Sequence, residues 1–125
     1  MEKRTGLADV ERTTMKVNIL GTEYTIEFRK DDQKLKENAD GYCDTSIKLI
    51  AIDDFEPDEM SKANLDGYKM QVLRHEIMHA FMYESGLDVN SCCLEGGWAA
   101  NEEMIDWFAI QSPKIFKVFK DVGCL

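Results

Sequence analysis

Residues 70–87 read MQVLRHEIMHAFMYESGL, and apolar side chains recur in this stretch every three or four positions. This period is typical of a helix with one buried face. The apolar positions are Met70, Leu73, Ile77, Ala80 and Phe81. Gly86 follows them, and glycine is common just after a helix end because it adopts the left-handed backbone conformation without strain. The pattern predicts one long helix over about residues 60–85.

The predicted helix contains the motif HExxH, formed by His75, Glu76 and His79. Residues four apart on a helix lie about one turn apart on the same side, so both imidazoles can bind one ion. Glu76 projects about 100° from His75, where its carboxylate can reach a water molecule on the metal without being forced to ligate it. The motif predicts a metal centre with His75 and His79 as ligands and Glu76 as the general base.

A third ligand is needed, because catalytic zinc normally has three protein ligands and one open position. The chain contains only two histidines, so the third donor must be a carboxylate or a thiolate. Glu102 is the candidate, near the start of a second helix for which Asn101 is a suitable N-cap. Asp106 lies four residues further along the same face, where it could accept the outer N–H of a ligand histidine. Glu103 is the alternative ligand.

The remaining elements are predicted from shorter patterns. Residues 17–20 and 24–28 read as a hairpin around a tight turn at Gly21-Thr22, and residues 29–40 as a charged loop or a short helical turn. Ser46–Ile52 is expected to form a third strand, at the edge of the sheet beside the cleft, where an extended peptide could pair with it. The second helix is expected to end near Gln111. A third should begin at Ser112-Pro113 and direct Ile115, Phe116 and Phe119 toward the core.

The motifs of residues 70–109 resemble those of the thermolysin-type gluzincins. The shared features are HExxH, a helix that closes at Ser85-Gly86-Leu87, and the NExxxD pattern of Asn101, Glu102 and Asp106. The whole chain also looks like the small HExxH peptidases encoded in phage and prophage genomes, including minigluzincin-like types. The resemblance implies a zinc-dependent peptidase that acts on a peptide or protein substrate. It assigns zinc binding to His75, His79 and Glu102, the base role to Glu76 and the orienting role to Asp106.

The predicted fold is α+β: a minimal zincin-like domain, with a small, mostly antiparallel N-terminal sheet followed by the HExxH helix and the Glu-bearing helix. One feature of larger gluzincins is missing, because they use a further histidine and a tyrosine to stabilise the oxyanion and no histidine remains here. Either a tyrosine substitutes for it or the activity is modest. Tyr83, one turn beyond His79, is favoured over Tyr24, Tyr42 and Tyr68.

Length and charge limit the function further. A chain of 125 residues is long enough for one core, so residues 15–125 are expected to form a single domain after a flexible arm of residues 1–14. The net charge of -9 disfavours nucleic acid and membrane surfaces as partners. The N-terminus has no apolar stretch typical of a signal peptide, so we expect a cytoplasmic protein with free thiols.

Two other functions remain open from the sequence. The chain could be a non-catalytic zinc-binding module for regulation or interaction, with Cys92 or Cys93 as a fourth ligand that closes the site. It could also be a latent precursor, in which residues 1–14 or the loop from Cys92 to Trp98 cover the metal.

Overall fold

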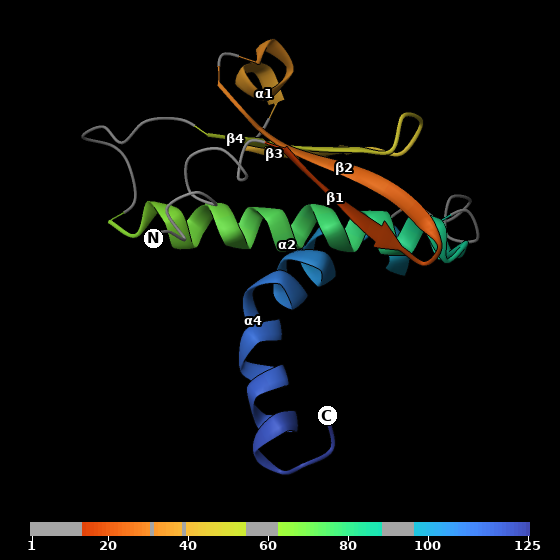
Figure 1. The fold of residues 1–125 in the computed structure, drawn as a ribbon, viewed down its shortest axis with the longest axis vertical. Helices are drawn as coiled ribbons and strands as arrows, with labels where there is room; N and C mark the ends of the chain where they lie inside the picture. Colours follow the sequence, from red (N-terminus) through yellow and green to blue (C-terminus); the bar gives the residue numbers. More distant parts are fainter. Residues whose placement is uncertain (1–13, 31, 39, 55–62, 89–96) are drawn as a thin grey trace.

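The computed structural model describes residues 14–30, 32–38, 40–54, 63–88 and 97–125 (Figure 1). The strands are β1 (Thr14–Ile19), β2 (Thr22–Arg29), β3 (Gly41–Asp44) and β4 (Leu49–Asp53), and the helices are α1 (Gln33–Asn38), α2 (Leu65–Glu84), the short 3-10 helix η2 (Trp98–Ala100) and α4 (Glu102–Asp121). The predicted α+β class is confirmed. Among the described helices, none combines the length and the apolar character that crossing a membrane requires.

The four strands form one sheet in the order β1-β2-β4-β3, with β2 and β4 parallel and the other two pairs antiparallel. The predicted hairpin is β1-β2. Its turn is Leu20-Gly21, one residue earlier than expected, because Ile19 pairs with Thr22. Both turn residues have positive φ, 51° and 94°, as a tight hairpin turn requires. The prediction of a small, mostly antiparallel sheet is therefore confirmed.

The expected third strand at Ser46–Ile52 is wrong in its bounds and in its position. Residues 45–48 form a turn that separates two antiparallel strands, β3 and β4. The Asp44 side chain makes this turn by accepting hydrogen bonds from the backbone N–H and the hydroxyl of Ser46. Of these two strands, β3 is therefore the one at an edge of the sheet. The apolar run of β4 lies inside the sheet, where both faces are covered.

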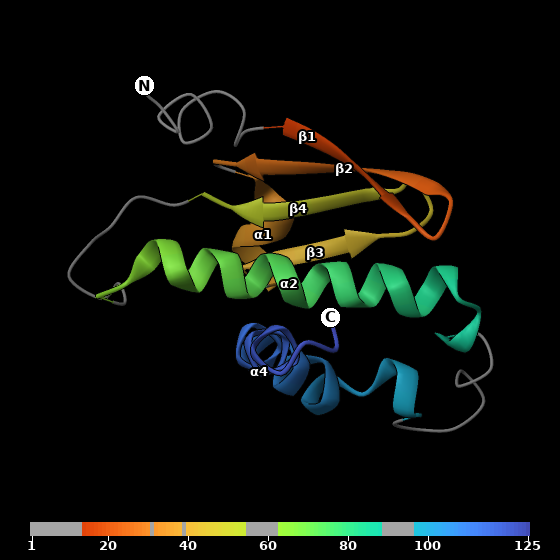
Figure 2. The same ribbon diagram turned by 60° about the horizontal axis from the view of Figure 1, so that its bottom comes forward.

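Helix α2 packs along one face of the sheet, and α4 lies on the side of α2 away from the sheet (Figure 2). The predicted apolar face is confirmed in this packing: Ala80 is fully buried, and Met70, Leu73, Ile77 and Phe81 are partly buried against the core. The helix begins at Leu65, later than predicted, because the Asn64 side chain caps it by accepting the Gly67 N–H. Gly86 has φ 85°, as predicted for the residue after the helix end.

The charged stretch between β2 and β3 contains the short helix α1, one of the two alternatives predicted for it. The Asp32 side chain caps this helix by accepting the backbone N–H groups of Lys34 and Leu35. Leu35 is the only large apolar residue of α1, and it is buried. The buried leucine and the capped end both favour this short helix.

The two helices predicted around Ser112-Pro113 are a single helix, α4, with Pro113 inside it. A proline has no N–H to donate to the carbonyl four residues earlier, here that of Ala109. The Arg74 Nε of α2 donates to this carbonyl at 2.6 Å instead. A hydrogen bond from the neighbouring helix therefore takes the place of the missing one, and α4 continues.

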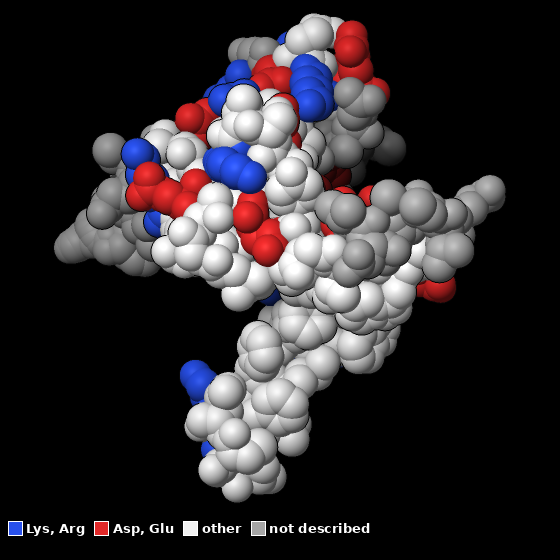
Figure 3. All heavy atoms as spheres, turned by 90° about the vertical axis from the view of Figure 1, so that its right-hand side faces the viewer, with Lys and Arg blue, Asp and Glu red and all other residues white. Residues whose placement is uncertain are grey.

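The C-terminal half of α4 projects away from the sheet (Figure 1), and much of it is uncharged on the face drawn in Figure 3. The prediction that its aromatic residues point into the core is wrong. Phe116 is 44% exposed and Phe119 is 40% exposed, while Ile115 is half-buried. A separate third helix could have folded back toward the core, whereas the continuous α4 carries these residues outward.

The hydrogen bond from Arg74 to the Ala109 carbonyl yields a stability prediction. We expect Arg74→Met to lower the free energy of unfolding by about 1–3 kcal/mol, because it leaves a buried carbonyl without a donor. In a Pro113→Ala background the new N–H of residue 113 can reach this carbonyl, so the same change should cost less. Urea unfolding of the wild type, the two single variants and the double variant measures the cost of Arg74→Met in both backgrounds. An equal loss in both backgrounds would contradict this account of how α4 tolerates its proline.

Candidate metal centre

His75 and His79 lie side by side on α2, at a surface that faces both β3 and the start of α4. Their Nε2 atoms are 3.2 Å apart, and their side chains are 17% and 25% exposed. The spacing follows from the helix, which places residues four apart one turn from each other. Together with Glu76 they form a group whose ligand atoms all lie within 4.8 Å of one another and which could hold a metal ion.

Helix α4 brings Glu102 to the same place. Its Oε1 lies 3.0 Å from the His75 Nε2 and 3.2 Å from the His79 Nε2. With the distance between the two imidazoles, these values define a nearly equilateral triangle of donor atoms. Tetrahedral zinc with bonds of about 2.0–2.1 Å has ligand atoms about 3.3 Å apart, so the donor set fits zinc in both chemistry and spacing.

The start of α4 positions Glu102. The Asn101 side chain accepts the backbone N–H of Met104 at 2.8 Å, so the predicted N-cap is confirmed. Glu102 follows immediately, and its side chain is 68% exposed. Glu103 is also exposed, and no contact between it and either histidine is found within the described part of the chain.

Asp106 lies one turn further along α4, on the other side of the His75 ring. Its Oδ1 is 2.6 Å from the His75 Nδ1. A carboxylate at this distance favours a proton on Nδ1, which leaves the lone pair of Nε2 directed toward Glu102 and His79. The sequence placed Asp106 on the same helix face as Glu102, and the structure brings both residues to His75.

Glu76 lies on the buried side of α2 and is only 7% exposed. No hydrogen bond to its carboxylate is found within the described residues. Burial raises the pKa of Glu76 to about 7; the charge of His75 opposes this shift, and the carboxylates of Glu102 and Asp106 add to it. A carboxyl group with a pKa near neutrality can both accept and return a proton at physiological pH.

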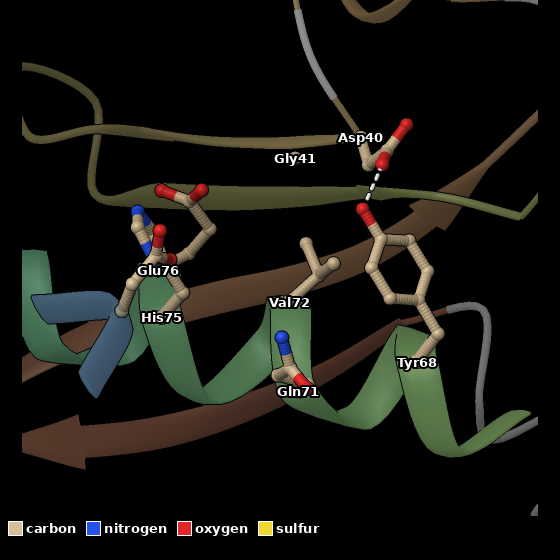
Figure 4. Close-up of a pocket in the computed structure, with 8 residues that line it drawn as sticks. Asp40, Gly41, Tyr68, Gln71, Val72, His75 and Glu76 are labelled. Carbon is tan, nitrogen blue, oxygen red and sulfur yellow. Dashed lines mark hydrogen bonds and ion pairs between the residues drawn. The ribbon is translucent and has the colours of Figure 1, made fainter. Parts of the chain in front are cut away.

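Two cavities meet at this group of residues. The smaller, of about 320 Å³, is lined by Asp40, Gly41, Tyr68, Gln71, Val72, His75, Glu76 and Asp106 (Figure 4). The larger, of about 560 Å³, is lined by Gly41, Tyr42, Cys43, Thr45, His75, Glu76, His79, Tyr83, Asp88 and Glu102. Both include His75 and Glu76, and both border Gly41, the first residue of β3. The candidate centre therefore lies in the middle of a cleft between α2 and the edge strand.

The four tyrosines have different positions relative to this cleft. Tyr24 is buried and donates to Glu84, and the Tyr42 hydroxyl accepts a hydrogen bond from Arg29. Tyr83, the tyrosine favoured from the sequence, lines the larger cavity. Tyr68 lines the smaller cavity and donates to Asp40. Its position seven residues before His75, on the same side of α2, was a signal that the sequence reasoning did not use.

Other predicted features of the site lie outside the described residues. These are Cys92 and Cys93, most of the loop that could cover the metal, and all of the predicted N-terminal arm except Thr14, which begins β1. Cys43 was not singled out from the sequence, and it lines the larger cavity. Burial raises the pKa of Cys43 to about 12, so it is a thiol at neutral pH and a poor metal ligand in that form.

Comparison of the chain with protein-family models, with curated proteins and with solved structures found no match. A metal site is therefore indicated by the arrangement of His75, Glu76 and His79 on α2 alone.

Proposed function

We propose that this protein is a zinc-dependent peptidase with His75, His79 and Glu102 as the metal ligands and Glu76 as the general base. The observation that carries the proposal is the convergence of three donor atoms within 3.2 Å of one another, beside a buried carboxylate without a described partner. Two imidazoles and one carboxylate, with one side open, are the ligand set of a catalytic zinc site. A closed structural site would have a fourth protein ligand.

Bound zinc would supply a Lewis acid that polarises the scissile carbonyl and makes a water molecule more acidic. Glu76 takes one proton from the attacking water and later gives it to the amine that leaves. The buried position of Glu76 suits this exchange, because a carboxylate shielded from bulk water holds its proton more readily than an exposed one. Asp106 keeps His75 in the tautomer whose Nε2 is free to bind.

The cleft supports a peptide as the substrate. Strand β3 is at the edge of the sheet and packs against α2, and its first residue, Gly41, borders both cavities. An extended peptide can add to an edge strand through backbone hydrogen bonds, with its side chains directed into pockets on either side. The sequence suggests this role for Ser46–Ile52. Because β3 is at the edge and β4 lies inside the sheet, we assign the role to β3.

The ligand assignment predicts different effects for two adjacent carboxylates. We expect Glu102→Gln to weaken zinc binding by more than about 100-fold, a larger loss than the 10–100-fold typical of residues that only orient a ligand. Glu103→Gln removes the same charge one residue away and should bind zinc like the wild type. Titration against a chromophoric chelator measures both affinities. A loss in Glu103→Gln with normal binding in Glu102→Gln would reverse the assignment.

The base assignment predicts that Glu76→Gln keeps zinc binding and loses hydrolysis by about 10²–10⁴-fold, since proton transfer to a positioned side chain contributes a factor of this size. A digest of a peptide library by the zinc-loaded wild type and the variant measures the loss. Full activity in Glu76→Gln would reject the base role. A wild type that binds zinc tightly and cleaves no peptide would favour the non-catalytic module.

A further inference from the structure

The smaller cavity is a pocket beside the candidate centre whose walls come from three parts of the chain. Asp40 precedes β3, Tyr68 and Val72 lie on α2, and Asp106 lies on α4. In Figure 4, Tyr68, Val72 and Glu76 rise from the same side of α2, and Tyr68 reaches Asp40. Glu76 is therefore at one end of the pocket and the pair of Asp40 and Tyr68 at the other. A substrate group in this pocket would lie directly beside the proposed reaction site.

The pocket has an unbalanced set of polar groups. Its lining includes the carboxyl groups of Asp40, Glu76 and Asp106, and none of the described lining residues is a lysine or an arginine. The Tyr68 hydroxyl donates a hydrogen bond to one oxygen of Asp40, and one oxygen of Asp106 is hydrogen-bonded to the His75 Nδ1. The second oxygen of each carboxylate has no hydrogen-bond donor among the described residues. Ionised carboxylates are acceptors only, so these second oxygens can accept hydrogen bonds from a ligand.

Glu76 provides an independent indication that a ligand belongs here. It is 7% exposed, lines the pocket and has no described hydrogen-bond partner. Buried polar groups in folded proteins are nearly always hydrogen-bonded, since leaving one unpaired is costly. Among the described residues Glu76 is such an exception, and its place at the wall of a cavity lets a bound ligand supply the missing donor.

On the basis of the proposed peptidase function, we propose that this pocket is a specificity subsite for a lysine or arginine side chain next to the scissile bond. An ammonium or guanidinium group supplies several donors and a positive charge to Asp40 and Asp106. The aliphatic part of such a side chain can pack against Val72 and the ring of Tyr68. The volume of about 320 Å³ is enough for one long side chain.

The test uses pairs of N-acetylated, fluorescently labelled peptides that differ at one position, with lysine against norleucine and arginine against citrulline. We expect the cationic peptide to have a kcat/KM about tenfold higher at one position beside the cleaved bond, the size of effect that a partly buried ion pair gives. Asp40→Asn should reduce this ratio toward one. Asp121→Asn, which removes the same charge from the far end of α4, should leave the ratio unchanged.

Binding of the same peptides to the zinc-loaded wild type, followed by fluorescence anisotropy, tests the subsite without hydrolysis. Tighter binding of the cationic peptides, lost in Asp40→Asn, supports the subsite even when no bond is cleaved, in which case only the peptidase proposal fails. Equal kcat/KM and equal Kd within each pair would overturn the subsite while leaving hydrolysis unaffected. If removing the acetyl group tightens binding equally for both peptides of a pair, the pocket binds an α-amino group and not a side chain, which would also overturn the subsite.

Discussion

The crossing of α2 and α4 is the contact on which the candidate centre depends, and two polar contacts at neighbouring positions hold it. Asp106 contacts His75 at 2.6 Å, and Arg74 donates to the carbonyl of Ala109 at 2.6 Å. Both α2 residues are adjacent, and both α4 residues lie within one turn. Sliding α4 along α2 would break both contacts together, so the register of the two helices is well defined. This register places Glu102 beside the two imidazoles. The Ala109 carbonyl, which Pro113 leaves without a helical donor, helps to set the register by accepting the hydrogen bond from Arg74.

Among the acidic and basic residues of α2, Lys69, Glu76 and Glu84 lie toward the sheet, and two of these three are compensated. Lys69 is buried and pairs with Asp54 at 2.6 Å. Glu84 accepts hydrogen bonds from Thr22, Tyr24 and Lys48, which ties the end of α2 to the sheet. Glu76, between them, has no such partner among the described residues. Lys69 and Glu84 on the same helix are both paired, so the lack of a described partner for Glu76 is better explained by a functional role of its carboxyl group than by a fault in packing.

The parts of the fold that the sequence predicted well depend on interactions between residues that are close in the sequence. Examples are the period of α2, the cap at Asn101 and the left-handed residue Gly86. The wrong predictions depend on contacts between distant residues. The sequence predicts a helix start at Pro113, because proline suits the first position of a helix. The prediction fails because Arg74, the donor that lets α4 continue, comes from another helix. The turn at residues 45–48 has no glycine or proline and depends on the Asp44 side chain, so its sequence resembles a strand. Asp40 was not singled out because only the fold brings it to Tyr68.

The charges at the cleft also link metal binding to the packing of α4. Burial is the main cause of the raised pKa of Glu76, and the carboxylates of Glu102 and Asp106 from α4 add to it, so each of them opposes a negative charge on Glu76. Like charges at short range oppose the contact that brings them together. In the proposed enzyme a divalent cation at His75, His79 and Glu102 would offset this repulsion. A ligand that binds one arrangement better than another stabilises that arrangement by mass action, so zinc binding and the docking of α4 on α2 should be coupled in this protein.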